Sequence, residues 1–104
     1  MKLKPSKRPK KRYIVFEAVS EELQTDSSVY NAIKRSALNV MGNQYYEAGI
    51  RFLKDKYNPS AHKGILRVNN KYSKTLIESI NRGKDIRTIG MSGILKKVEA
   101  KYLN

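Results

Sequence analysis

An alternation of apolar and polar residues over positions 12 to 20 predicts that this chain is built on a β-sheet. Ile14 and Phe16 fall on one side of the expected strand, and Tyr13 and Val15 fall on the other. This is the period of two that an extended chain gives, and the residues are strong β-formers.

The remaining patterns extend this strand into a βαββαβ order followed by a last helix. Thr25 to Ser28 offer helix caps, and apolar residues then recur at helical spacing until Gly42. The predicted elements are a strand at 12–20, a helix at 25–41, strands at 49–55 and 64–69, a helix at 73–82, a strand at 85–91 and a helix after Ser92. This order predicts an α/β (α+β) ferredoxin-like or RNA-recognition-like sandwich with a four-stranded antiparallel sheet.

The length of 104 residues suits one domain, and we place that domain at residues 13–104. Residues 1–12 carry seven bases and no acid, together with two prolines. Like charges repel and prolines interrupt helices, so we expect a basic arm that is disordered until it meets an anion. A plain solubilising tail is the alternative.

The formal net charge is +13, from 22 Lys and Arg against 9 Asp and Glu. Such an excess predicts a polyanionic partner, first of all nucleic acid. The chain has no cysteine, which excludes disulfides, thiolate nucleophiles and cysteine-ligated metals. No apolar run approaches the roughly 18 residues of a membrane span, so we expect a cytoplasmic protein that binds no membrane.

Candidate catalytic residues are sparse. His62 is the only histidine, and no serine-carboxylate pair stands near it in sequence, although general-base catalysis needs an oriented partner. Among the carboxylates only Glu21, Glu22 and Asp26 cluster, at an expected helix start where acids favour the helix dipole. Helix capping is the favoured explanation and a magnesium site the lesser one; we expect no catalytic residue, no metal ligand and no cofactor bound by this chain.

Candidate binding residues fall into two groups. Ser92 and Gly93 lie where a strand ends and a helix begins, and backbone N–H groups there predict a phosphate cradle, with an ordinary cap as the alternative. The outer sheet face, through Tyr13, Val15 and Ile65, is half apolar. It lacks the aromatic pair of base-stacking modules, so we expect it to meet a protein partner or the last helix.

Four stretches of the chain resemble the archaeal ribonuclease P protein component 2 family, whose eukaryotic counterpart is shared with the mitochondrial-RNA-processing ribonuclease. They are RPKKRYIVFE at 8–17, SVYNAI at 28–33, GILRV at 64–68 with Lys71 and Tyr72, and RTIGMSGILKK at 87–97. They span nearly the whole chain in the family's order, and residues 42 to 60 match least. The resemblance implies an RNA-recognition-like fold and a role in removing 5′ leaders from precursor tRNA.

The resemblance also implies that catalysis belongs to the RNA subunit and its Mg²⁺ ions, and that the chain pairs with protein component 3. Our hypothesis is a non-catalytic subunit that contacts ribonuclease P RNA, and precursor tRNA only indirectly, and that self-associates when isolated. The alternative is a free-standing RNA-binding or ribosomal-type protein. The residues expected to neutralise RNA phosphates are Lys7, Arg8, Lys10, Lys11, Arg12, Arg87, Lys96 and Lys97.

Overall fold

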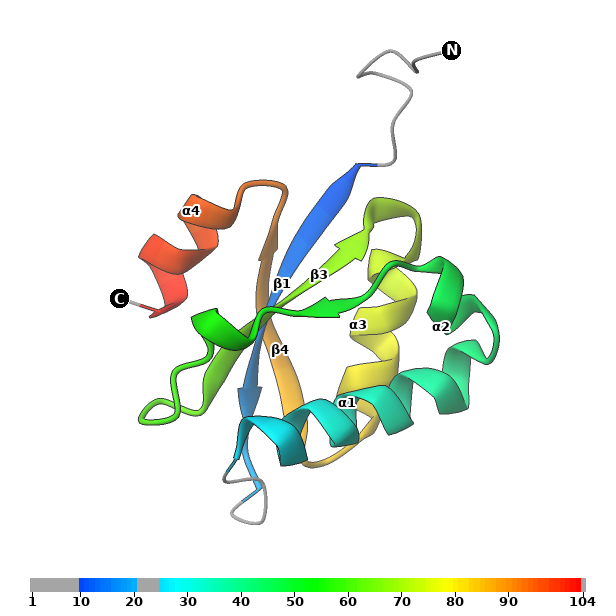
Figure 1. Ribbon diagram of the computed structural model, residues 1–104, viewed down its shortest axis with the longest axis horizontal. Helices are drawn as coiled ribbons and strands as arrows, with labels where there is room; N and C mark the ends of the chain where they lie inside the picture. The colour runs from blue at the N-terminus through cyan, green and yellow to red at the C-terminus, as the bar shows by residue number, and fades with distance from the viewer. Residues whose placement is uncertain (1–9, 21–24, 104) are drawn as a thin grey trace.

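The computed structural model describes residues 10–20 and 25–103 as a single sheet with helices on both faces (Figure 1). The strands are β1 (Lys11–Ala18), β2 (Arg51–Phe52), β3 (Lys63–Asn69) and β4 (Ile86–Ser92). The helices are α1 (Asp26–Met41), α2 (Gln44–Glu47), α3 (Ser73–Arg82) and α4 (Leu95–Val98), which continues as a π-helical stretch, Glu99–Leu103. Short 3₁₀ helices at Lys54–Lys56 and Asn70–Tyr72 complete the chain.

The sheet is antiparallel with the strand order β2-β3-β1-β4. This arrangement confirms the predicted α+β ferredoxin-like fold. The predicted strands at 64–69 and 85–91 agree with β3 and β4 to within one residue, and α3 has the predicted bounds. β1 begins at Lys11, so the last two residues of the expected arm, Lys11 and Arg12, lie in the strand.

The two faces of the sheet have separate cores. Ile14, Phe16 and Leu66 point to one side and pack beneath α1 and α3; we call this side the α1/α3 face. Val15 and Ile65 point to the other side and pack with Val98, and this side is the α4 face. Figure 1 shows α4 and the helix pair on opposite sides of the sheet, as alternation along the strands requires.

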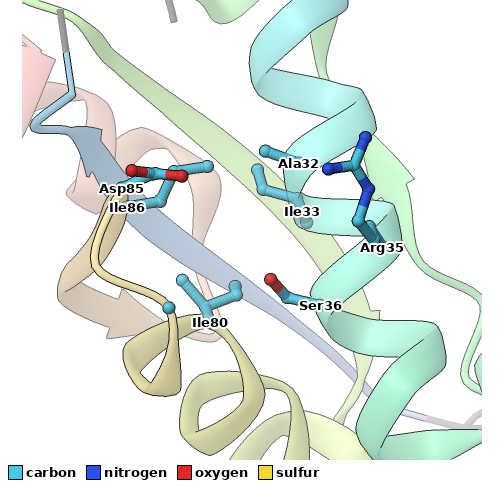
Figure 2. Close-up of a pocket in the computed structure, with 8 residues that line it drawn as sticks. Ala32, Ile33, Arg35, Ser36, Ile80, Asp85 and Ile86 are labelled. Atoms are coloured by element: carbon cyan, nitrogen blue, oxygen red, sulfur yellow. The ribbon is translucent and has the colours of Figure 1, made fainter. Parts of the chain in front are cut away.

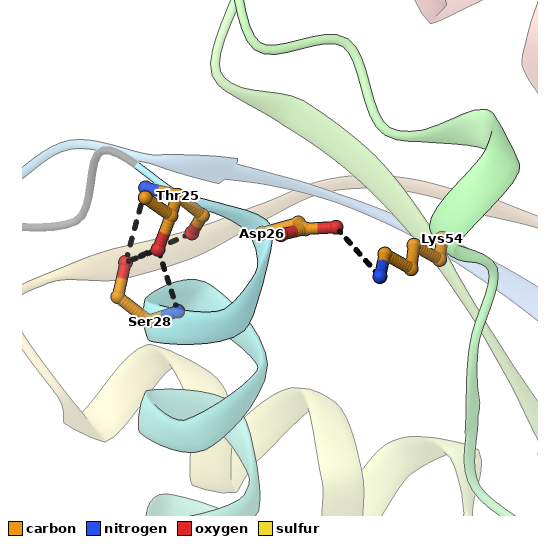
Figure 3. Close-up of polar contacts among 4 residues, drawn as sticks. All are labelled: Thr25, Asp26, Ser28 and Lys54. Atoms are coloured by element: carbon orange, nitrogen blue, oxygen red, sulfur yellow. Dashed lines mark hydrogen bonds and ion pairs between the residues drawn. The ribbon is translucent and has the colours of Figure 1, made fainter.

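The start of α1 is fixed by reciprocal hydrogen bonds (Figure 3). Thr25 Oγ1 accepts from the Ser28 backbone N–H at 3.1 Å, and Ser28 Oγ accepts from the Thr25 N–H at 3.2 Å. Two donors that the first helical turn leaves open are thereby satisfied. Asp26, in that turn, forms an ion pair with Lys54 at 3.7 Å, as expected for an acid at a helix N-terminus. Glu21 and Glu22, the other members of the predicted acidic cluster, lie outside the described residues.

The region 42–57 departs most from the prediction. The strand expected at 49–55 is limited to Arg51 and Phe52, and the unpredicted helix α2 precedes it. Gly49 has φ +64°, a left-handed conformation that a strand does not contain. After Leu53 the chain turns into the 3₁₀ helix, so the predicted strand was too long at both ends.

A helix cap at Ser92, the alternative to a phosphate cradle there, is not found. The helix begins after Ile94, which is extended at φ −125° and ψ 116° and is 51% exposed. Ser92 Oγ instead accepts from the Ile94 N–H at 3.1 Å in a tight turn. Leu95, Val98 and Tyr102 pack on the sheet, whereas Ile94 does not.

Candidate nucleic-acid interface

One end of the sheet gathers residues that are far apart in the sequence. β1 begins where β3 and β4 end, because β1 is antiparallel to both. Lys11 lies opposite Asn69, and Tyr13 lies opposite both Arg67 and Ser92. The base of the N-terminal arm therefore meets the Ser92–Gly93 turn, although some 80 residues separate them in the sequence. We call this part of the molecule the basic end.

Hydrogen bonds order the bases at this end. The Lys11 ammonium donates to the Asn69 side chain, and Arg12 Nε donates to Asn70 Oδ1 at 2.9 Å. The Asn70 N–H donates to the Lys10 carbonyl at 2.7 Å. Neutral amides thus hold these side chains without cancelling their charge. They remain able to attract an anion.

Arg12 also reaches the turn after β4. A Cβ built on Gly93 would lie 3.2 Å from Arg12 Nη1, so the guanidinium lies directly against this glycine. The predicted cradle at Ser92 and Gly93 is thus brought together with Arg12. The Ile94 N–H already donates to the Ser92 hydroxyl and is not left for an anion, so the cation beside the turn is the clearest anion-attracting feature.

Lys96 and Lys97 follow this turn on α4, and both are exposed. They lie three and four residues after Gly93. Lys7 and Arg8, which were predicted to act with them, lie outside the described residues. Lys10, Lys11, Arg12, Lys96 and Lys97 are therefore the predicted RNA-binding bases that the structure places around one end of the sheet.

Arg87 lies elsewhere. It is near the start of β4, opposite Glu17, while Ser92 is at the strand's other end. Ser92 is five positions further along the strand than Arg87, roughly 16 Å at the usual rise. Its Nη2 and Nε contact Glu17 Oε1 at 2.6 and 3.0 Å, so a carboxylate already matches its charge.

The predicted partner surface lies under the last helix. Val15 and Ile65 have no exposed surface, and Tyr13 is partly buried beside them. Gly90, opposite Val15 on β4, allows this close approach because a Cβ there would overlap the Tyr102 ring. Lys56 and Glu99 form an ion pair at 2.8 Å that ties the helix to the turn after β2. A partner could reach Val15 and Ile65 only if α4 moved away.

The structure also contains a cavity of about 120 Å³ between α1 and the α3–β4 turn (Figure 2). Its lining mixes Ile33 and Ser36 of α1 with Ile80, Asp85 and Ile86.

In residues 10–20 and 25–103, no three His, Asp or Glu side chains cluster as metal ligands would. His62 is exposed and far along the chain from this cavity, in a turn where its φ is 55°. No helix in the described part of the chain is long and apolar enough to span a membrane.

Sequence reasoning missed the asparagines and two of the arginines. Asn69 and Asn70 hold the arm's base, and neither stood out in the sequence. Arg67 lies in β3 and Arg51 in β2, a strand whose bounds the sequence did not predict correctly. Only the strand register, which places Arg51 opposite Arg67, could have identified them as a pair.

Comparison with known proteins identifies relatives over the full length. Residues 12–103 match the model of the Rpp14/Pop5 family. The chain is 34% identical to ribonuclease P protein component 2 of Pyrococcus abyssi, over 100% of this chain and 96% of that protein. The proteins of the same name from Pyrococcus horikoshii and Methanococcus vannielii are 35% and 33% identical, over 97% and 98% of this chain and 89% and 82% of theirs.

Proposed function

Because the chain belongs to the Rpp14/Pop5 family, we propose that it acts as a non-catalytic protein subunit of ribonuclease P whose basic end binds the RNA subunit. Its relatives are named ribonuclease P protein component 2, and their sequence similarity covers nearly the whole chain. Both facts support the assignment. In this role the RNA subunit and its Mg²⁺ ions carry out the removal of 5′ leaders from precursor tRNA. The protein contributes binding and charge.

The strand register of the sheet is the observation that supports RNA binding by the basic end. It places Lys10, Lys11 and Arg12 next to the Ser92–Gly93 turn, from which Lys96 and Lys97 extend. Bases at one end can follow a phosphate backbone and displace its counterions. A subunit that binds the folded RNA more tightly than the unfolded RNA keeps the fold populated, so less Mg²⁺ is required.

The direct test is precursor-tRNA cleavage by reconstituted ribonuclease P RNA and component 3 at limiting Mg²⁺, with and without this chain. We expect the chain to raise the rate, and the gain to shrink as Mg²⁺ is increased. No gain at any Mg²⁺ concentration, with RNA binding intact, would instead indicate an RNA-binding protein outside this enzyme.

A pair of matched variants tests the interface. Lys96→Gln with Lys97→Gln removes two exposed charges from the basic end, and Lys74→Gln with Lys84→Gln removes two exposed charges from α3 and the loop after it. The slope of log affinity for the RNA against log salt concentration should fall by roughly 1.4 to 1.8 in the first variant, because two phosphate contacts are lost. The second should keep the slope; equal changes in both would contradict the proposed interface.

The arm is part of the same proposal. Removing residues 1–9 deletes Lys7 and Arg8 along with two further lysines, while β1 stays complete. The salt slope should fall again, and an unchanged slope would exclude the arm from the interface.

Pairing with protein component 3 is proposed separately, through the Tyr13, Val15 and Ile65 surface. Tyr102→Ala removes the ring that lies on Gly90 and loosens α4 over this surface. If component 3 binds there, the variant should bind it more tightly than the parent chain does. Unchanged or weaker binding would place component 3 on another surface.

A further inference from the structure

Two arginines face each other across β2 and β3 at the basic end. Arg51 and Arg67 are direct partners in the antiparallel register, so they share a face of the sheet. That face is the α4 face, because Arg67 is also opposite Tyr13, and Tyr13 shares its side of β1 with Val15. Side chains at directly opposed positions begin roughly 5 Å apart. The two side chains therefore start close together on this face.

Neither arginine has an acidic partner among the described residues. The ion pairs of residues 10–20 and 25–103 involve Asp26, Glu99 and Glu17, with Lys54, Lys56 and Arg87. Reading across the strands, Arg51 and Arg67 continue into Tyr13 and Ser92. This set, which we call the basic row, contains no carboxylate. Like charges directly opposed across strands destabilise a sheet.

Arg67 also has a hydrogen-bond donor that no described residue satisfies. Its Nε is buried, and no hydrogen-bond acceptor reaches it within the described residues. A buried donor without an acceptor is rare in folded proteins, because it gives up its hydrogen bonds to water without replacing them. Arg51 is exposed at the edge strand, so a ligand from solvent can reach the pair through Arg51.

The surroundings extend the positive charge. Lys11 is diagonal to Arg67 on the same face, because its own partner is Asn69, two residues further along β3. Glu47, whose carbonyl accepts from Asn69, has its carboxylate engaged by the Tyr72 hydroxyl at 3.0 Å. The basic row is therefore continuous with the bases at the start of β1.

We propose that Arg51 and Arg67 together bind one phosphate group of an RNA backbone on the α4 face. Guanidinium groups donate paired hydrogen bonds to phosphate oxygens, and one phosphate can accept from two of them. The bound anion separates the like charges and, once the Arg67 guanidinium turns toward it, gives that group an acceptor. The proposal rests on the proposed function, because the RNA is the ribonuclease P RNA that binds the basic end, and it adds a site that the arm and α4 do not contain.

The test uses the full chain with Arg51→Gln, Arg67→Gln, both together, and Arg35→Gln as the control. Arg35 is exposed on α1, across the sheet from the pair. Affinity for ribonuclease P RNA is measured over a range of salt concentrations, and thermal unfolding is measured for each variant. Component 3 binding is measured in parallel, since a protein carboxylate could occupy the same arginines.

Each single variant should weaken RNA binding about tenfold at low salt and reduce the salt slope by roughly 0.7 to 0.9. The double variant should lower the slope no further, because both arginines share one phosphate. Its melting temperature should stay the same or rise, since a repulsive pair has been removed. Arg35→Gln should match the parent chain in slope.

Retained RNA binding with an unchanged slope in the double variant would overturn the phosphate site and leave the proposed function intact. A lower melting temperature with that unchanged slope would show that the arginines act in folding. Loss of component 3 binding alone would make the ligand a protein carboxylate and also overturn the site. Absence of RNA binding by the parent chain would contradict the proposed function and the site together.

Discussion

The two ends of the α4 face carry similar bases in opposite electrostatic settings. At one end Arg87 and Lys63 flank Glu17, and Arg87 contacts its carboxylate at 2.6 Å; we call these three residues the paired row. At the other end the basic row holds Arg51 and Arg67 with no acid between them. Bases that are paired with acids stabilise the fold. Bases that are left unpaired are available to a ligand, but they lower the stability of the fold.

The part of the face that α4 covers lies between these two rows. A substitution there should have the largest effect on the free energy of unfolding. Gly90→Val places a side chain where the Tyr102 ring lies, so the helix must shift away from Val15 and Ile65. Overpacking of this kind costs about 1 to 3 kcal/mol of unfolding free energy. Thermal unfolding should show a melting temperature lower by roughly 4 to 8 °C per kcal/mol.

Gly93→Ala is the matched control for that change. A Cβ at Gly93 meets only the flexible Arg12 guanidinium, so the melting temperature should change little. Equal losses in the two variants would show that Tyr102 is not held against Gly90.

Glu17→Arg turns the paired row into a second basic row. Three bases would then lie side by side across β3, β1 and β4, replacing an attraction with a repulsion. We expect the free energy of unfolding to fall by about 1 kcal/mol at low salt. Urea unfolding at low and high salt checks this, because screening should remove most of the loss; a loss that does not depend on salt would contradict the electrostatic reading.

Arg51→Glu makes the opposite conversion and turns the basic row into a paired one. A Glu opposite Arg67 supplies the missing acceptor, so the free energy of unfolding should rise by about 0.5 kcal/mol. Affinity for ribonuclease P RNA should fall at the same time. The two measurements should therefore move in opposite directions, and a chain that lost both stability and affinity would contradict the comparison.

The smallest effect on stability is expected from the Lys56–Glu99 ion pair, which joins the last helix to the turn after β2. Pairing with Glu99 raises the pKa of Lys56, so the folded chain holds this proton more tightly than the unfolded chain does. The stability from the pair is complete below the ordinary lysine pKa and is lost as the pH rises through the raised value. Lys56→Gln should lower the melting temperature slightly at pH 8, and the difference from the parent chain should vanish at strongly alkaline pH.

Local patterns were sufficient to predict most of the fold. The alternation in β1 and the caps of α1 are properties of neighbouring residues, so they can be recognised from the sequence alone. β2 was misjudged because its length depends on Gly49 and on where β3 stops pairing with it. The cap of α4 failed because Ser92 forms a turn with Ile94 before the helix begins.

The interface was less predictable because it depends on register. The composition of the chain indicates a polyanionic partner, and the runs at 7–12 and 96–97 are visible as charge. Whether a base is paired depends on the residue opposite, which can lie 70 positions away, as Glu17 and Arg87 do. The sequence therefore could not show that Arg87 has an acidic partner or that Arg51 and Arg67 lie opposite each other.

Lysine acetylation of the full chain, with and without ribonuclease P RNA, tests most directly whether the basic end binds RNA. Mass spectrometry then reports each lysine. We predict that the RNA protects Lys10, Lys11, Lys96 and Lys97, while Lys74 and Lys84 on the α1/α3 side keep their reactivity. Protection of Lys74 and Lys84 with Lys96 and Lys97 still reactive would contradict the account.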